Sequence, residues 1–154
     1  MSRSMRRQRV LAMASGGGHW IQLQRLRPAF SEFDVAFVSV YPDYASDVEG
    51  HRFYHVADIT RLSLGKLLVL APQLLMILAR ERPSVVLTTG SAPGLVCIAL
   101  AKLFGARTIW IDSIANCERM STSGSQARRF ADRWLTQWPD LAHSGGPEYW
   151  GAVL

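Results

Sequence analysis

The stretch LAMASGGGHWIQLQRL at residues 11–26 decides the fold. A short apolar run ends in three glycines, and an amphipathic segment follows them. This pattern predicts a buried strand, a tight turn and a helix. The amides that open such a helix point outward with partial positive charge, and glycines let a ligand approach the backbone closely. The turn is therefore expected to hold a phosphate or pyrophosphate. The alternative is a connection that holds no ligand.

This glycine turn differs from two common phosphate-binding motifs. No Gly-Lys-Ser/Thr follows it, so it is not a P-loop. Gly16 and Gly18 fit the first two positions of the dinucleotide fingerprint, but Ile21 stands where the third glycine belongs. A small nucleotide-binding oxidoreductase, with Asp43 facing a ribose, is therefore the weaker functional alternative.

Strands alternate with helices along the rest of the chain. We predict strands at residues 10–14, 35–40, 52–57, 84–90, 107–113 and 134–138, and helices at 20–30, 62–79, 91–106 and 123–133. This alternation is typical of an α/β fold, here a Rossmann-like, open, mostly parallel sheet with helices on both faces. The length of 154 residues suits a single domain over residues 10–154, after a basic tail at residues 1–9.

Composition narrows the functional classes. Two cysteines, Cys97 and Cys117, and four scattered histidines give no disulfide framework and no zinc spacing, so we expect neither metal nor cofactor in a reduced, cytoplasmic setting. The net charge is +5, and four arginines within residues 1–9 contribute four of those charges. The remainder is nearly neutral, which argues against a nucleic-acid-binding face. The tail is either solvated or in contact with an anionic membrane surface.

The most apolar segment, residues 62–79, is interrupted by Lys66, Pro72 and Gln73. It is shorter than the about 20 apolar residues that a membrane-spanning helix needs. We expect either a buried crossover helix or a helix partly exposed to a lipid interface.

Polar turns follow three of the predicted strands, at residues 15–19, 88–94 and 112–124. Because the carboxyl ends of parallel strands meet at one edge of a sheet, we expect these turns to form one polar cleft. Ser121 or Ser123 has the simpler alternative of capping the next helix. The candidate ligand-binding residues are Gly16, Gly17, Gly18, Thr89, Gly90, Ser91, Ser113, Asn116, Ser121 and Ser123.

With these turns in view, the chain resembles the membrane-associated subunit of the two-part UDP-GlcNAc transferase of asparagine-linked glycosylation. It looks most like the bacterial versions that serve capsule and exopolysaccharide synthesis. The resemblance is carried by SGGGHWIQL, VLTTGSAPG, WIDSIANCERMSTSG, ADRWLTQWPDLA and YWGAVL, in that order. A looser resemblance connects the chain to the N-terminal half of the transferase that makes lipid II.

The resemblance implies the N-terminal, acceptor-side half of a two-Rossmann-domain glycosyltransferase. A separate partner would supply the donor-binding C-terminal half. The acceptor would be a sugar on a polyprenyl pyrophosphate at the cytoplasmic face of the membrane, which this chain would contact peripherally. Two features depart from the family: the first strand follows the arginines without a hydrophobic anchor, and Asp112 and Asn116 replace a Glu and an Arg of the eukaryotic form.

Several residues receive roles on this basis. The amides of Gly16, Gly17 and Gly18 would hold the pyrophosphate. His19 is the first choice for general base, because the helix dipole favours neutral imidazole. Asp112 and Glu118 are rivals, and a pyrophosphate hydrogen bond or a helix cap is the alternative role for His19. A non-catalytic membrane scaffold is the second functional reading. The apolar tail either packs on its own domain or docks into the partner through Tyr149, Trp150, Val153 and Leu154.

Overall fold

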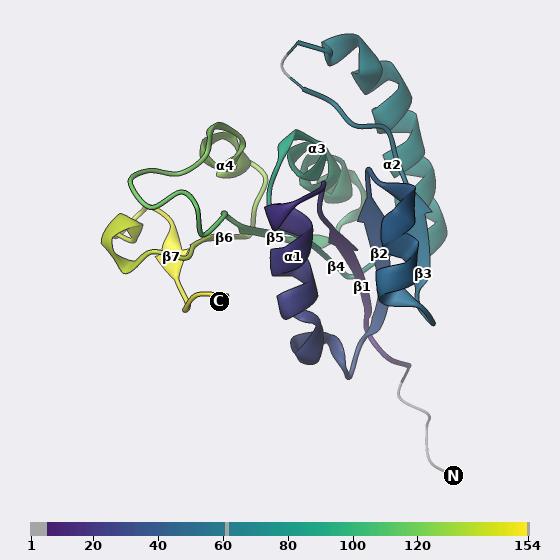
Figure 1. Cartoon of the computed structure of the whole chain (residues 1–154), viewed down its shortest axis with the longest axis horizontal. Coiled ribbons are helices and arrows are strands. Elements are labelled where there is room, and N and C mark those ends of the chain that lie inside the picture. The colour runs from purple at the N-terminus through teal and green to yellow at the C-terminus, as the bar shows by residue number, and fades with distance from the viewer. Residues whose placement is uncertain (1–5, 61, 154) are drawn as a thin grey trace.

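Seven parallel strands form one sheet in the computed structural model, which describes residues 6–60 and 62–153. They are β1 (Arg9–Met13), β2 (Asp34–Ser39), β3 (Arg52–His55), β4 (Val85–Thr88), β5 (Arg107–Ile111), β6 (Arg133–Thr136) and β7 (Glu148–Tyr149). Their order in the sheet is β3-β2-β1-β4-β5-β6-β7, so the winding reverses between β1 and β4 (Figure 1). This order confirms the predicted Rossmann-like fold.

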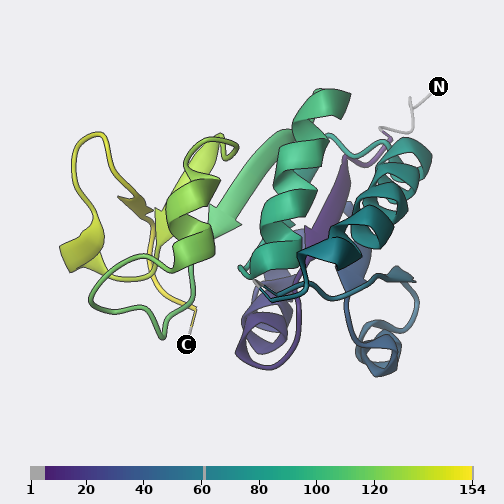
Figure 2. The same ribbon diagram turned by 90° about the horizontal axis from the view of Figure 1, so that it is seen from above.

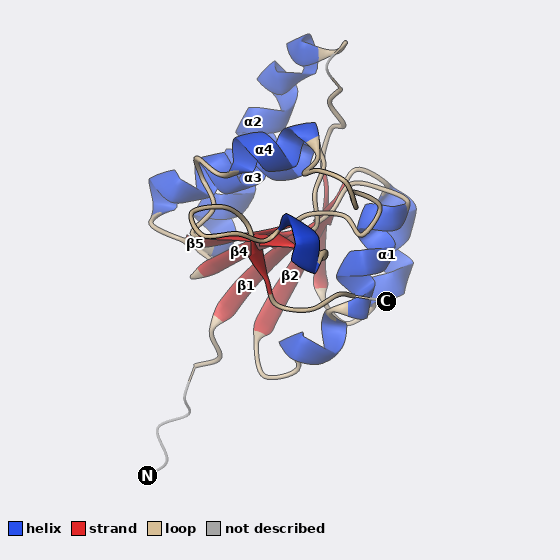
Figure 3. Cartoon of the chain, turned by 90° about the vertical axis from the view of Figure 1, so that its left-hand side faces the viewer, coloured by secondary structure: helices blue, strands red, loops and turns tan. Residues whose placement is uncertain are grey.

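Helices cover both faces of this sheet (Figures 2 and 3). On one face lie α2 (Leu67–Glu81), α3 (Ala92–Ala101) and α4 (Thr122–Ala127), and on the other lies α1 (Gly18–Arg25). Short 3-10 turns complete the connections: η1 (Arg27–Phe30), η2 (Pro42–Val48), η3 (Leu64–Lys66), η4 (Lys102–Phe104) and η5 (Pro139–Leu141).

The core is split by the sheet into two clusters. In β1, Leu11 and Met13 pack against α2 and α3, whereas Ala12 faces the side of α1. This alternation follows from the pleat, which points successive side chains to opposite faces. Because both faces are buried after Arg9, residues 10–13 of the strand are all apolar, as their sequence indicates.

All four helices are shorter than predicted, α1 and α4 mainly because they end early, and one strand was not predicted. The helix expected at residues 20–30 ends at Arg25, and Pro28, which has no N–H to donate, lies in η1. The helix expected at 123–133 ends at Ala127, and Asp132 instead pairs with Thr108 beside it in the sheet. The two-residue strand β7 follows the strand that we expected to be the last.

Helix α2 buries one side and exposes the other. Leu70, Leu74 and Leu78 lie in the core, at the spacing of one helical face. On the other side, Leu68 is 83% exposed, and Val69 and Met76 are exposed as well. Just before the helix, Leu62 is 99% exposed and Leu64 of η3 is also exposed. The amino end of α2 projects beyond the carboxyl edge of the sheet (Figure 1). None of the described helices is long and apolar enough to cross a membrane.

An ion cluster joins the opposite, amino edge of the sheet to the end of α2. The buried carboxylate of Glu81 accepts hydrogen bonds from Arg52 and Tyr54, and Arg52 also pairs with Asp34 at 3.0 Å. Arg9 belongs to β1 rather than to the tail, and it donates to the carbonyl of Glu81 at 2.9 Å. Burial raises the pKa of Glu81, but the hydrogen bonds from Arg52 and Tyr54 and the charge of Arg52 bring that pKa below its usual value.

Candidate functional site

The first glycine turn leads directly into α1. Gly17 has φ +60° and ψ −130°, a conformation that favours glycine, and α1 begins at Gly18 without a side-chain cap. The amide of Gly17 donates to the hydroxyl of Tyr44 at 3.1 Å. Of the three glycine amides expected to face a pyrophosphate, this one therefore already has a protein partner. The amides of Gly18 and His19 belong to the first turn of α1, where an amide has no carbonyl of the same helix to donate to.

The loop after β2 folds over this turn, which the sequence analysis did not predict. The ring of Tyr44 stacks on Trp20 with ring centroids 4.7 Å apart, and Trp20 Nε1 donates to Asp47 at 2.9 Å. A signal was present, because YPDY follows the carboxyl end of a strand, where ligands of such sheets bind. Asp43, considered above for a ribose contact, lies exposed in the same loop.

The first and second turns are joined through His19. Its Nδ1 lies 3.0 Å from the carbonyl oxygen of Thr89, and the Thr89 hydroxyl donates to the carbonyl oxygen of His19 at 2.6 Å. Gly90, with φ +125°, lies against the ring: a Cβ at this position would be 2.8 Å from Nδ1. Two turns that are 70 residues apart in the sequence therefore share one hydrogen-bonded contact.

This contact fixes the chemistry of the imidazole. A carbonyl oxygen only accepts hydrogen bonds, so Nδ1 must carry the proton and donate it. In neutral imidazole, Nε2 is then the basic nitrogen, and no hydrogen bond to it occurs within the described part of the chain. The ring of His19 is half-buried, and its Nε2 is the nitrogen that remains available to a ligand.

The second turn places Ser91 in a strained conformation. Its φ is +79°, which is uncommon for a residue with a side chain, and its buried Oγ has no hydrogen-bond partner among the described residues. Ser91 precedes α3 without capping it. This backbone geometry brings Gly90 against His19.

The third turn is organised around Asp112, which is 2% exposed. Its Oδ1 accepts from Trp110 Nε1 at 3.1 Å and from the Ser121 hydroxyl at 2.6 Å. Its Oδ2 accepts from Asn116 Nδ2 at 3.2 Å and from the Ser121 amide at 2.8 Å. Four donors fill the acceptor sites of one carboxylate. This geometry makes Asp112 the anchor of the turn and leaves it poorly placed to take a proton from a ligand.

The remaining residues of the third turn have different surroundings. Ser121 caps α4 by accepting a hydrogen bond from the Gly124 amide at 2.9 Å, which is the capping role that the sequence offered as the alternative to ligand binding. The hydroxyl of Ser113 accepts from Gln22 of α1 at 3.1 Å, which ties this turn to the helix that carries His19. Ser123 is half-buried, and Glu118 is exposed.

The tail lies apart from His19, at the outer end of the sheet. Tyr149 and Trp150 are exposed, and the guanidinium of Arg133 lies 5.6 Å from the ring centroid of Trp150. The amide of Val153 donates to Gln137 at 2.7 Å, so this part of the tail packs on its own domain. Leu154 lies outside the described residues.

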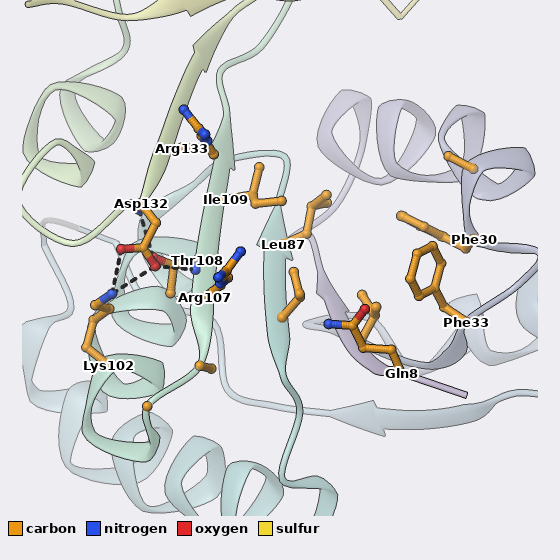
Figure 4. A pocket seen from close by; sticks show the side chains of 15 residues that line it. Gln8, Phe30, Phe33, Leu87, Lys102, Arg107, Thr108, Ile109, Asp132 and Arg133 are labelled. Carbon is orange, nitrogen blue, oxygen red and sulfur yellow. Dashed lines mark hydrogen bonds and ion pairs between the residues drawn. The ribbon is translucent and has the colours of Figure 1, made fainter. Parts of the chain in front are cut away.

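A groove of about 890 Å³ lies at the amino edge of the sheet, opposite the three turns (Figure 4). Leu87 and Ile109 form its floor, on the face of the sheet that α1 covers only in part. Phe30 and Phe33 stand on one side, and the basic side chains of Arg107, Arg133 and Lys102 stand on the other. The groove lies near the amino ends of β4–β6, away from the three turns.

A family model described as "Oligosaccharide biosynthesis protein Alg14 like" matches residues 43–153, well over half of the chain. The UDP-N-acetylglucosamine transferase subunit ALG14 of Eremothecium gossypii is 33% identical over 78 residues, which are 47% of this chain and 35% of that protein. The subunit alg14 of Schizosaccharomyces pombe is 39% identical over 67 residues, 39% of this chain and 31% of that one. The chain thus matches about a third of the length of these curated relatives.

Solved structures share the fold at low sequence identity. The crystal structure of Acinetobacter baumannii MurG superposes with a TM-score of 0.76 at 13% identity, over 92% of this chain and 45% of that one. The UDP-N-acetylglucosamine 2-epimerase of Rickettsia bellii gives 0.66 at 15% identity, over 87% of this chain and 40% of that one. In both cases the superposition covers less than half of the longer protein.

Proposed function

This chain belongs to the family of Alg14-like oligosaccharide biosynthesis proteins, and from that premise we propose that it is the acceptor-side subunit of a heteromeric inverting glycosyltransferase. The enzyme transfers a sugar from a UDP-sugar to an acceptor linked to a polyprenyl pyrophosphate, in polysaccharide or oligosaccharide biosynthesis. A partner subunit binds the donor. Because the curated relatives are named as subunits of a UDP-N-acetylglucosamine transferase, UDP-N-acetylglucosamine is the donor to test first.

The proposed step is a displacement at the anomeric carbon. The acceptor hydroxyl oxygen forms the new bond to that carbon, and the bond to the UDP oxygen breaks with its electron pair leaving on UDP. The hydroxyl proton moves to Nε2 of His19. A general base positioned in this way typically contributes 10²–10⁴ in rate. The observation that carries the proposal is the contact between Nδ1 of His19 and the Thr89 carbonyl, which leaves Nε2 as the basic nitrogen.

The pyrophosphate of the acceptor is proposed to lie before α1. The amides of Gly18 and His19 would donate to it, together with the Tyr44 hydroxyl that now accepts from Gly17. Asp112 holds the third turn in place, so that Asn116, Ser123 and Glu118 line the acceptor side. Glu118 is exposed and remains the alternative base in this arrangement.

Contact with the membrane is proposed through the amino end of α2. Leu62, Leu64 and Leu68 are exposed there beside Lys66, a composition that suits insertion into a lipid interface. This end of α2 projects from the same edge as the three turns, so a lipid-linked acceptor would meet the site from the membrane side (Figure 1). Arg9 lies at the opposite edge in an ion cluster, so it is not proposed as a lipid contact.

The donor-binding partner is proposed to dock on the groove at the amino ends of β4–β6 and on the exposed Tyr149 and Trp150. The apolar floor of the groove and the basic Arg107 and Arg133 fit a partner helix with an apolar face and acidic flanks. The exposed tail residues continue this surface along β6 and β7.

Substitution of His19 tests the proposed role. In the complex reconstituted with its partner, His19→Ala should lower kcat at least about 100-fold. The matched control is His143→Ala, because His143 is an exposed histidine on the loop after η5. Turnover within about threefold of the unsubstituted protein would rule out His19 as the base. If that His19→Ala complex also kept its membrane binding, the non-catalytic scaffold would be the better description.

A further inference from the structure

Two buried glutamines connect the tail to the third turn. Gln22 of α1 and Gln137, which follows β6, are 4% and 2% exposed. A buried amide is stable only if its donors and acceptors are paired, because an unpaired group loses its bonds to water without replacement. The partners of these two amides therefore reveal what holds the region together.

Gln137 reaches three separate segments. Its Nε2 donates to the side-chain oxygen of Gln22 at 2.6 Å and to the backbone carbonyl of Asp112 at 2.9 Å. Its Oε1 accepts from the amide of Val153 at 2.7 Å. Both amide hydrogens and the oxygen are thus engaged, so the amide has one favourable orientation.

Gln22 extends this connection into the third turn. Its Oε1 also accepts from the amide of Ile114 at 3.3 Å, and its Nε2 donates to the hydroxyl of Ser113 at 3.1 Å. Three consecutive residues that open the third turn are therefore held by the two glutamines. Trp138, next to Gln137, adds a bond from its Nε1 to the carbonyl of Ile114 at 2.7 Å.

We propose that Gln137 is a positioning residue that couples the seating of residues 151–153 to the geometry of the third turn. When Val153 is seated, its N–H fixes the Gln137 amide, which then holds the Asp112 carbonyl and, through Gln22, Ser113 and Ile114. When the tail leaves, Gln137 loses that donor and the third turn loosens. The coupling itself does not depend on the proposed function, but its role in the reaction does. In that reaction, a partner that holds the tail in place would order the acceptor side of the site.

Amide hydrogen exchange on the full chain tests this coupling without substrate or partner. The reporters are the amides of Ile114, Asn116 and Ser121, which bond within the third turn and its contacts. Val153→Pro removes the N–H that donates to Gln137, together with the valine side chain, and Gln137→Leu removes the whole amide. Val153→Pro should accelerate the reporters about tenfold, the effect of losing roughly one hydrogen bond, and Gln137→Leu, which removes three, should accelerate them at least as much. A chain ending at Ala152 serves in place of Val153→Pro if proline does not fit the backbone.

Two controls separate coupling from general loosening. Trp150→Ala removes a large tail side chain but keeps the Val153 N–H, so the reporters should be unaffected. The amide of Asp34, which donates to Gln8 at the far side of the sheet, should exchange at its original rate in every variant. The proposal is overturned if the reporters do not accelerate, if Trp150→Ala accelerates them as much as Val153→Pro, or if Asp34 accelerates equally.

Kinetics in the reconstituted complex give the consequence for the reaction. Gln137→Leu should raise the KM for the lipid-linked acceptor about tenfold and leave the KM for the UDP-sugar unchanged. A purely structural loss would instead lower the active fraction, and so kcat, with both KM values unchanged. Exchange that follows the predicted pattern in a chain without transferase activity would leave the coupling intact and refute only the proposed function.

Discussion

His19 acquires its orientation from residues 70 positions away. The Thr89 carbonyl sets which ring nitrogen carries the proton, and Gly90 gives the ring room to lie against the second turn. The sequence alone therefore identifies His19 as a candidate base. The turn after β4 determines that Nε2, and not Nδ1, is its available nitrogen.

Replacing Gly90 by alanine tests this orientation. A Cβ would lie 2.8 Å from Nδ1, and φ is +125°, so Gly90→Ala should displace the ring as well as strain the backbone. We expect at least a tenfold loss of transferase activity in the reconstituted complex and about 1 kcal/mol of stability. Gly145→Ala is the control: φ there is +77°, but nothing lies within 4 Å of the added Cβ. Equal activity losses in the two variants would contradict a specific contact with His19.

The two cysteines should differ sharply in reactivity. Complete burial raises the pKa of Cys97 to about 12, whereas Cys117 is exposed on the third turn. Because the thiolate is the reactive form, a thiol reagent at pH 8 should modify Cys117 of the folded chain rapidly and Cys97 only in denaturant. Mass spectrometry after proteolysis identifies the site, and rapid modification of Cys97 would contradict its burial.

At the scale of the elements, α2 carries two unlike regions. Its amino end is apolar and exposed, and its last residue, Glu81, is buried in an ion cluster with β2 and β3. One helix therefore combines the proposed lipid contact with the anchoring of the opposite edge of the sheet.

The ion cluster makes stability dependent on pH. The pKa of Glu81 is lower in the folded protein than in the unfolded chain, so its contribution is fully present above the unfolded-state pKa and is lost as pH falls through the folded-state pKa. Glu81→Gln should lower the free energy of unfolding by about 3 kcal/mol at pH 7. This difference should shrink in urea titrations below about pH 4. The exposed Glu49→Gln should have little effect at either pH, and a constant difference for Glu81→Gln would refute the assignment.

The exposed leucines of α2 give a second prediction at this scale. Leu68→Ser should weaken binding to vesicles of phosphatidylglycerol and phosphatidylcholine by more than about tenfold, because it removes about 2 kcal/mol of apolar burial in the lipid interface. The free energy of unfolding should hardly change, since Leu68 is 83% exposed. Leu103→Ser, on η4 at the opposite edge, is the control and should bind as the unsubstituted chain does. Equal vesicle binding by all three proteins would exclude α2 as the contact.

At the scale of the whole molecule, the sheet separates two surfaces with different proposed tasks. The three turns and the amino end of α2 lie at the carboxyl edge, and the groove lies at the amino ends of β4–β6. A partner that docks on the groove must therefore also extend to the carboxyl edge, where its bound UDP-sugar would meet the acceptor beside His19.

Charge reversal on the groove tests partner docking. Arg107→Glu should weaken association with the donor-binding partner about tenfold or more, because it opposes the acidic flanks expected there. Arg129→Glu reverses an exposed charge near the end of α4, on the other face of the sheet, and should leave the affinity unchanged. Titration by biolayer interferometry compares the two. An unchanged Kd for Arg107→Glu would exclude this side of the groove from the interface.

The parts of the fold that were predictable from sequence are those encoded locally. The strand, turn and helix of residues 11–26 follow from their own pattern, and three polar turns at strand ends already place the candidate site at one edge. The contact between Gln22 and Gln137 joins residues 115 positions apart, so no local sequence pattern predicts it. Likewise, the serine at position 121 reads as a helix cap, but its second bond, to the carboxylate of Asp112, depends on the tertiary fold.

The amino end of α2 and the groove lie at opposite edges of the sheet, so the groove would lie well away from a bilayer that α2 contacts. Strands such as β1, with five residues, span about 17 Å at roughly 3.3 Å per residue. That height exceeds the screening length of about 8 Å at physiological ionic strength. If α2 rests on the bilayer, the electrostatics of partner recruitment at Arg107 is decided by the bulk salt and not by the headgroups. Partner affinity should therefore fall as salt rises and remain the same on anionic and neutral vesicles.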